Sequence, residues 1–425
     1  MDTGQELGRA YRPRIIDLAV QRALEATGAV VIEGARASGK TMTALNAARS
    51  YAFVDDPRTR QLLEIAPEAL LEGERPRLLD EWQVAPDIWN LVRRAVDRSE
   101  SAGQYLLTGS ALPADDITRH TGAGRFLRLR QRTMSWHEKR DGEPGRVSLM
   151  ALFDGERPAA STGGEPAIES VIDGIVQPGF PAMTALDHAQ SAQRLRGYID
   201  EIARTDVRRL SDVRHGPDAI RQLIRSLARS TASEVTYATL AKDLRATAPG
   251  ISAETTRGYV ELLERLFVVE AQLPWAPALR SRARLRRSPK LHLVDPSLAA
   301  VALGAGPEAL LADLETLGLL FESAVVHDLL VLASAQDGEV RHYRNSNGKE
   351  IDAIVMLPDG RWGAVEIKLG GGQISAGVAS LRAAIEEIDT SVVGEPAFSL
   401  VVTGTGPVLT AGDGTVTCSL GDLAP

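Results

Sequence analysis

Short apolar runs alternate with helical patterns over the first 140 residues of the chain. Residues 29–33 (AVVIE) form an apolar run that ends at a glycine, and a helical pattern follows from 40 to 49. Further apolar runs lie at 51–55, 77–80 and 105–109. This spacing is typical of a parallel β-sheet covered by helices. Residues 1–140 are therefore predicted to form one α/β domain.

Three different patterns follow this region. Residues 141–190 are rich in Gly, Pro, Ser and acidic residues and predict a flexible connector. Residues 191–300 carry helical periodicity, and within them 235–244, a break at ATAPG and a helix from Ser252 read as helix-turn-helix. Residues 301–425 return to helices and short strands, which predicts a second α/β domain. The expected fold class is thus α/β at both ends, with a helical, winged-helix-like middle.

Composition narrows the setting. Hydrophobic residues make up 44% and charged residues 24% of the 425 positions, which is enough apolar surface for several cores. The apolar stretches look too short and too interrupted for a membrane span, and the single cysteine, Cys418, excludes an internal disulfide. A cytoplasmic protein without membrane contact is predicted. The net charge of -8 argues against indiscriminate binding of polyanions, although one basic face is compatible with it.

A phosphate-binding motif follows the first apolar run. Residues 34–41 (GARASGKT) fit the pattern G-x-x-x-x-G-K-[ST]. They lie between a predicted strand and a predicted helix, which is the position of a P-loop. Its backbone N–H groups would face the phosphates of ATP, Lys40 would reach the β and γ phosphates, and the Thr41 hydroxyl would ligate Mg²⁺. The predicted cofactors are ATP and Mg²⁺, and the predicted contacts are Gly34, Ala35, Arg36, Ala37, Ser38, Gly39, Lys40 and Thr41.

Residues on three later segments are candidates for the rest of this site. Asp80 ends an apolar run and could hold the Mg²⁺ shell, and the adjacent Glu81 could polarise the attacking water as general base. Thr108 ends the next run and could sense the γ-phosphate. Arg125 follows a glycine and could serve a neighbouring subunit as a trans-acting finger, which predicts a homo-oligomer. A plain turn and a solvated arginine remain alternatives for Thr108 and Arg125.

These segments together resemble a known family, the AAA-type ATPases whose C-terminal half is the DUF4143 domain. The resemblance rests on GARASGKT, FVDDPRTR, LLDEWQVAPDIWNLVRRAVD, YLLTGS and GAGRF, and it continues through GFPAM, RGYIDEIARTDVRRL, SPKLHLVDPSL, GKEIDAIV and WGAVEIKLG. It implies a P-loop ATPase with Asp80 and Glu81 as its acidic pair, then a winged-helix-like segment, then a restriction-endonuclease-like fold. It says little about biological role.

The most basic stretch of the chain lies near the end of the middle region, at residues 280–290. Its cations could neutralise DNA phosphates, in which case binding would weaken steeply with salt. A solvated loop or an interface to an acidic surface is the alternative. The candidate nucleic-acid-binding residues are Arg280, Arg282, Arg284, Arg286, Arg287 and Lys290.

The last domain carries a D…E-x-K pattern. Asp352 lies on one predicted strand, and Glu366 and Lys368 lie on the same face of the next. Two carboxylates and a lysine suit metal-dependent phosphodiester cleavage, with Glu322 as a further candidate ligand and Gln373 as a weaker one. An exposed sheet face without any catalytic role is the alternative.

The preferred interpretation is an ATP-hydrolysing protein whose nucleotide state controls DNA binding or processing. A nucleotide-controlled scaffold for a partner protein, with no nuclease activity, is the competing hypothesis. A nucleotide kinase using the same P-loop ranks last, because no acceptor-binding motif is evident.

Overall fold

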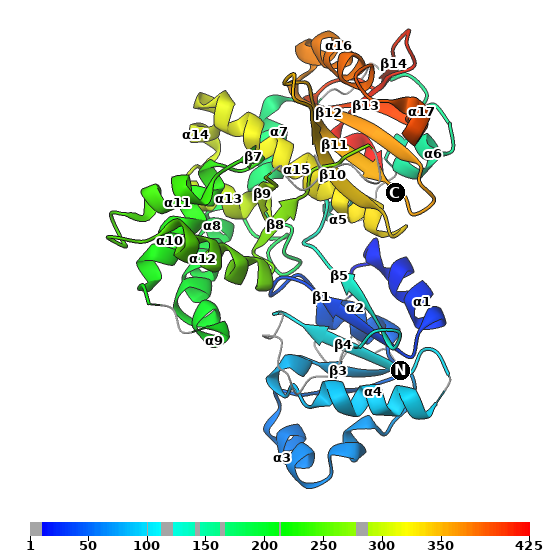
Figure 1. Ribbon diagram of the computed structural model, residues 1–425, viewed down its shortest axis with the longest axis vertical. Coiled ribbons are helices and arrows are strands. Elements are labelled where there is room, and N and C mark those ends of the chain that lie inside the picture. The colour runs from blue at the N-terminus through cyan, green and yellow to red at the C-terminus, as the bar shows by residue number, and fades with distance from the viewer. Residues whose placement is uncertain are drawn as a thin grey trace. The chain divides into compact units, whose positions relative to one another are not determined.

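The computed structural model describes residues 11–99, 101–111, 122–140, 145–161, 166–211, 214–277 and 288–425 (Figure 1). It divides into two compact units. Unit 1 comprises Met1–Thr133 with Arg265–Phe267, and unit 2 comprises Met134–Glu264 with Val268–Pro425. Each unit is described by itself below.

Unit 1 is a five-stranded parallel sheet in the order β2-β3-β4-β1-β5. This confirms the α/β domain predicted from the apolar runs. Its strands are β1 (Ala29–Glu33), β2 (Ser50–Phe53), β3 (Arg77–Asp80), β4 (Tyr105–Gly109) and β5 (Phe126–Arg130). Its α-helices are α1 (Ile16–Ala26), α2 (Lys40–Ala47), α3 (Pro57–Ile65) and α4 (Ile88–Arg98).

Both faces of this sheet are buried. Successive residues of a strand point to opposite faces, and the side chains on each face of β1 pack in an apolar cluster. In β1, Val30 and Ile32 pack with α1 and α2 in one apolar cluster. Ala29 and Val31 pack on the other face in a cluster that includes Trp89 of α4. The continuous apolar run of β1 is thus typical of a strand covered on both faces. The packing holds β1 in place, and the P-loop begins directly after its last residue.

The first part of unit 2 is mainly helical. Three of its elements form a small antiparallel sheet in the order β7-β9-β8. The helices and strands, in chain order, are α5 (Trp136–Lys139), β6 (Val147–Ser148), α6 (Leu149–Phe153), α7 (Ile168–Val176), α8 (His188–Glu201), α9 (Val207–Leu210), α10 (Pro217–Arg229), β7 (Ser233–Glu234), α11 (Tyr237–Leu244), α12 (Ala253–Arg265), β8 (Val269–Gln272), β9 (Lys290–Leu293), α13 (Pro296–Leu303) and α14 (Pro307–Ala312).

The helix-turn-helix segment contains the helices expected of it. Helices α11 and α12 flank the break, and the hydroxyl of Ser252 accepts a hydrogen bond from the backbone N–H of Thr255 at 3.0 Å. Ser252 therefore caps α12, as its position before the helix suggested.

Residues 141–190 differ from the expected connector in the parts that the structure describes. Helices α6 and α7 both lie here, and the apolar side chains of α7, including Val171, Ile172 and Ile175, are buried. These three residues have helical spacing, which the glycine-rich and proline-rich composition of the surrounding stretch obscured.

The last part of unit 2 is built on a six-stranded mixed sheet in the order β10-β11-β12-β13-β15-β14. Strands β10, β11 and β12 are antiparallel neighbours, whereas β12, β13 and β15 are parallel. The elements are α15 (Leu314–Ser334), β10 (Glu339–Arg344), β11 (Glu350–Met356), β12 (Trp362–Gly370), α16 (Ile374–Ile385), α17 (Thr390–Val393), β13 (Phe398–Thr405), β14 (Leu409–Thr410), β15 (Val416–Ser419) and β16 (Leu423–Ala424).

The helical part and the mixed sheet form one unit, where the sequence suggested separate domains meeting near residue 300. Polar contacts join them: the Gln272 amide donates to the Asp352 carbonyl at 2.9 Å, and the Lys290 ammonium pairs with the Glu322 carboxylate at 2.6 Å. Strands β8 and β9 thus contact α15 and β11 directly.

Helix α15 is the one described helix that is long and apolar enough to cross a membrane, a stretch that the sequence reading did not single out. Most of it is covered, since 72% of its most apolar window is buried inside the protein. A core helix has the same character, so α15 is weak evidence for a membrane span.

Candidate active site in unit 1 and charged cluster in unit 2

The P-loop curls between β1 and α2 through two glycines in unusual backbone conformations. Gly34 has a φ of 156°, and a Cβ built on it would lie 2.0 Å from the carbonyl oxygen of Gln131. Gly39, with a φ of 98°, immediately precedes α2. Glycine is required at Gly34 by the close backbone approach and favoured at Gly39 by the left-handed conformation. The loop leads directly into the N-terminus of α2, where an anion binds favourably.

Lys40 lies in the first turn of α2 and is buried. Its ammonium donates a hydrogen bond to the Ala35 carbonyl at 2.7 Å, which holds the side chain back along the loop. Burial lowers the pKa of Lys40 to about 8, while the carboxylates of Glu81 and Asp80 oppose that shift. The lysine is therefore close to losing its charge at mildly alkaline pH unless an anion binds beside it.

This shift predicts how ATP affinity changes with pH. The phosphates of bound ATP raise the pKa of Lys40, so binding is strongest below pH 8 and weakens as the pH rises above the pKa of the free protein. We expect about an eightfold loss of affinity between pH 7.5 and 9. Fluorescent-nucleotide titrations over this range measure it. Lys40→Met should bind weakly and without this pH dependence, and a flat wild-type profile would contradict the assignment.

Thr41 and Asp80 meet where a magnesium ion is expected in P-loop proteins. The Thr41 hydroxyl hydrogen-bonds the Asp80 carboxyl, and the Thr108 hydroxyl donates to Asp80 Oδ1 at 2.5 Å. Burial raises the pKa of Asp80, and both hydroxyls oppose this. A hydroxyl beside a carboxylate is a donor set that Mg²⁺ accepts, so Thr41 and Asp80 fit the ion.

Thr108 is fully buried, and its hydroxyl is engaged twice. It donates to Asp80 and accepts from the backbone N–H of Glu81 at 3.1 Å. The hydroxyl thus holds both members of the acidic pair, and its direct contact with a γ-phosphate stays a prediction. Adjacency of β3 and β4 brings these residues together.

Glu81 follows β3 in a left-handed backbone conformation, with a φ of 57°. Its Oε2 accepts hydrogen bonds from the side-chain amide of Gln83 and from the Ser110 hydroxyl, the latter at 3.2 Å. The Gln83 amide also donates to Ser110 at 3.3 Å. One carboxylate oxygen is thus held by two donors, which fixes the direction in which the other points.

Gln83 is accordingly expected to be a positioning residue for Glu81. Removing a hydrogen bond to a carboxylate should leave the base misaligned, so Gln83→Ala should lower kcat for ATP hydrolysis by about tenfold while KM for ATP hardly changes. Steady-state kinetics separate the two constants. Gln61→Ala, the same change on the exposed face of α3, is the matched control. An unchanged kcat in Gln83→Ala would rule the role out.

Arg14 and Gln131 support the P-loop from behind, and sequence reasoning missed both. The buried Arg14 guanidinium donates to the Ser38 carbonyl at 2.9 Å and to the Arg132 carbonyl at 3.0 Å. The Gln131 amide donates to the same Ser38 carbonyl at 3.2 Å. Neither residue belongs to a recognisable sequence motif, because each donates to backbone carbonyl groups, which every residue type carries.

Arg125 lies immediately before β5, at the amino end of the sheet, whereas the P-loop follows the carboxyl end of β1. Its guanidinium pairs with Asp97 at 2.8 Å. Arg125 therefore does not contact the nucleotide site of its own chain. A finger role would require a second copy of the protein and release from Asp97.

A second group of charged residues gathers in unit 2. We call it the carboxylate–lysine cluster, and it consists of Lys290 on β9, Glu322 on α15, Asp352 on β11, and Glu366 and Lys368 on β12. The structure thus brings together all four residues of the predicted D…E-x-K site. Lys368 pairs with Glu366 at 2.7 Å, and Asp352 Oδ2 accepts the backbone N–H of Ile367 at 2.8 Å.

Burial and mutual repulsion dominate the electrostatics of this cluster. Burial, and next to it the charge of Asp352, raise the pKa of both Glu322 and Glu366 to about 7. The two lysines oppose these shifts. Asp352 is therefore the carboxylate that repels both glutamates, while each glutamate pairs directly with its own lysine.

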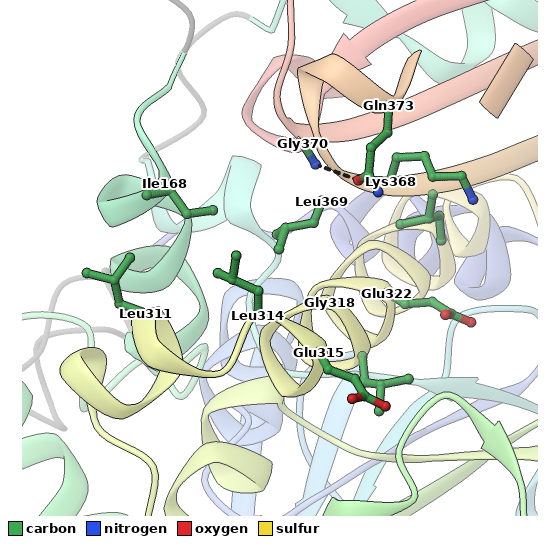
Figure 2. A pocket seen from close by; sticks show the side chains of 12 residues that line it. Ile168, Leu311, Leu314, Glu315, Gly318, Glu322, Lys368, Leu369, Gly370 and Gln373 are labelled. Atoms are coloured by element: carbon green, nitrogen blue, oxygen red, sulfur yellow. Dashed lines mark hydrogen bonds between the residues drawn. The ribbon is translucent and has the colours of Figure 1, made fainter. Parts of the chain in front are cut away.

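A cavity of about 650 Å³ opens onto the cluster. Figure 2 shows Glu322 and Lys368 at one end of it and the apolar side chains of Ile168 and Leu311 at the other. Gln373 lines the cavity, but its side-chain oxygen accepts the backbone N–H of Gly370 at 3.1 Å. That oxygen caps a turn, which argues against the ligand role considered for Gln373.

Comparison with known proteins identifies the modules. An AAA domain matches residues 26–139, and a domain of unknown function, DUF4143, matches residues 317–422. The chain therefore contains an AAA domain of the P-loop type and a C-terminal DUF4143 domain. Another domain of unknown function, DUF8612, matches residues 168–309 between them. The resemblance noted in the sequence is confirmed for both ends of the chain.

The chain is also similar to two uncharacterized proteins, Rv2008c of Mycobacterium tuberculosis and Mb2031c of Mycobacterium bovis. Each is 26% identical over 368 residues, which covers 82% of this chain and 72% of the relative. Among solved structures, the Walker-type ATPase PABY2304 of Pyrococcus abyssi aligns with a TM-score of 0.39 and 15% identity, covering 69% of this chain and 96% of that one.

Lys290 does not lie on a basic surface, although arginines precede it in the sequence. It is buried, with its ammonium 2.6 Å from Glu322 and 4.0 Å from Asp352. The reason is that Lys290 is the first residue of β9, a strand whose residues are all buried. The other five candidates, Arg280, Arg282, Arg284, Arg286 and Arg287, lie outside the described residues.

The carboxylate–lysine cluster does not fit a divalent cation as it stands. Ammonium groups already neutralise Glu322 and Glu366, and within the described residues no group of three or more metal-ligating side chains could hold an ion. The cluster therefore differs from the two-carboxylate metal site that the D…E-x-K pattern predicted.

Proposed function

We propose that the protein binds ATP with Mg²⁺ at the P-loop and hydrolyses it, and that nucleotide state controls DNA binding by unit 2. The observation that carries the ATPase part is the meeting of Lys40, Thr41, Asp80 and Glu81 at the carboxyl edge of one parallel sheet. The AAA domain match supports the same activity.

Each residue of this site has a distinct task in the proposed reaction. Lys40 binds the phosphates, and Thr41 and Asp80 hold the magnesium ion, which neutralises phosphate charge when bound. Glu81, with one oxygen held by Gln83 and Ser110, uses the other to orient and deprotonate the attacking water.

The DNA part of the proposal has two supports. The order α10, β7, α11, α12, β8, β9 with an antiparallel β7-β9-β8 sheet supports the winged-helix-like interpretation of this region. The five arginines between 280 and 287 follow β8 and precede β9 in the sequence. By contrast, Glu254 and Glu261 flank Arg257 on the exposed face of α12, so phosphate contacts would depend on the arginines.

The test compares DNA retention and ATP turnover in wild type and in a variant with the five arginines replaced by alanine. We expect duplex DNA to stimulate turnover of the wild type, and we expect the variant to lose both retention and stimulation. Its basal turnover should persist, because unit 1 is unchanged. Wild-type turnover that is indifferent to DNA would favour the competing function, a nucleotide-controlled scaffold for a protein partner.

A further inference from the structure

Lys290 lies among the carboxylates of the carboxylate–lysine cluster. We propose that its ammonium group takes the place of a metal ion there and keeps divalent cations from binding. Its ammonium lies 2.6 Å from Glu322 Oε1 and 4.0 Å from Asp352 Oδ1. The side chain is only 10% exposed, so water does not screen these contacts effectively.

Charge balance supports this assignment. With every group ionised, the three carboxylates and two ammonium groups of the cluster leave one negative charge. Because the pKa values of Glu322 and Glu366 are raised to about 7, the charge at neutral pH is closer still to zero. A divalent cation would overcompensate it. Without Lys290 the cluster would have two negative charges, which one divalent cation neutralises. The lysine of the E-x-K pattern, Lys368, is a separate group paired with Glu366.

Lack of access does not explain the exclusion. The cavity of about 650 Å³ is lined by both Glu322 and Lys368 (Figure 2), so a hydrated ion could approach the carboxylate of Glu322. Mg²⁺ requires oxygen ligands at about 2.0–2.1 Å. Binding between Glu322 and Asp352 would thus require the ammonium of Lys290 to leave.

Lys290 and the other residues of the cluster come from different domains. Lys290 lies within the DUF8612 match, whereas Glu322, Asp352, Glu366 and Lys368 lie within DUF4143. The middle module therefore closes a site belonging to the C-terminal module. With Lys290 in this position, a metal-dependent reaction at the cluster would first require its ammonium to leave Glu322 and Asp352.

The experiment measures Mn²⁺ binding by electron paramagnetic resonance, using full-length protein without nucleotide. Wild type, Lys290→Met and Lys290→Gln share the same P-loop, so differences between them report on the cluster. We expect both substitutions to tighten Mn²⁺ binding by at least about tenfold, because an ammonium no longer competes for the carboxylates. Adding Asp352→Asn should abolish the gain. Lys290→Arg, which keeps the charge, should resemble wild type.

Two results would overturn the proposal. One is a wild-type Mn²⁺ site that disappears in Asp352→Asn, because the cluster would then hold metal with Lys290 in place. The other is a folded Lys290→Met or Lys290→Gln protein that binds Mn²⁺ no better than wild type. Thermal unfolding with and without Mn²⁺ gives an independent readout, since a newly bound ion should raise the midpoint of the variants and not of wild type.

Discussion

Glu81→Gln is expected to lower the rate of ATP hydrolysis by about a hundredfold or more while leaving ATP affinity nearly unchanged. Glutamine keeps the shape of the side chain but is not a base, and general-base catalysis contributes on this order. Glu81 lies at the end of β3 beside Asp80, with Oε2 held by Gln83 and Ser110. Its other oxygen is the one that we assign to the attacking water.

Phosphate release and nucleotide binding, measured on the same preparation, check this expectation. Glu25→Gln serves as a matched control, because Glu25 is exposed near the end of α1, which leads into the amino end of β1, whereas the P-loop follows the carboxyl end of that strand. Turnover that survives in Glu81→Gln would mean that another group activates the water. Equal loss of binding and turnover would mean that the substitution had disturbed the P-loop.

Lys290→Met is expected to destabilise the protein by about 3 kcal/mol, because removing one partner of a buried ion pair leaves the other charge without compensation. Glu322 would lose its direct partner, and Asp352 a nearby cation. Urea-induced unfolding of the full chain measures the change. This effect distinguishes a lysine inside the cluster from a lysine on a DNA-binding surface, where substitution would hardly affect stability.

The double variant Lys290→Met/Glu322→Gln provides the control. Removing both charges should recover part of the stability lost in Lys290→Met, which a double-mutant cycle quantifies. Arg257→Met breaks an exposed pair with Glu261 and should have little effect. Wild-type stability in Lys290→Met would contradict the buried pair seen in the structure.

The sequence was most informative where chemistry depends on neighbouring residues in the chain. The P-loop from Gly34 to Thr41 follows its strand directly, and the parallel sheet expected around it is confirmed. Apolar runs locate β1, β3 and β4 because strands buried on both faces must be apolar throughout. The D…E-x-K residues also meet as the strand alternation predicted.

Contacts between distant segments were harder to anticipate. Ser110 reaches Glu81 only because β4 pairs with β3, and Arg14 reaches the P-loop through a backbone carbonyl. Lys290 was misassigned because its neighbours in the sequence are arginines, whereas its neighbours in space are carboxylates. A run of basic residues in a sequence therefore does not show that each of its members is exposed.

The most direct test of the central claim is phosphate release from ATP by wild type and Lys40→Ala, each with Mg²⁺ and with EDTA. We predict turnover only for wild type with Mg²⁺, because Lys40 binds the phosphates, and Thr41 and Asp80 fit the ion. Turnover that persists in Lys40→Ala or in EDTA, or a wild type that binds ATP without hydrolysing it, would contradict the account.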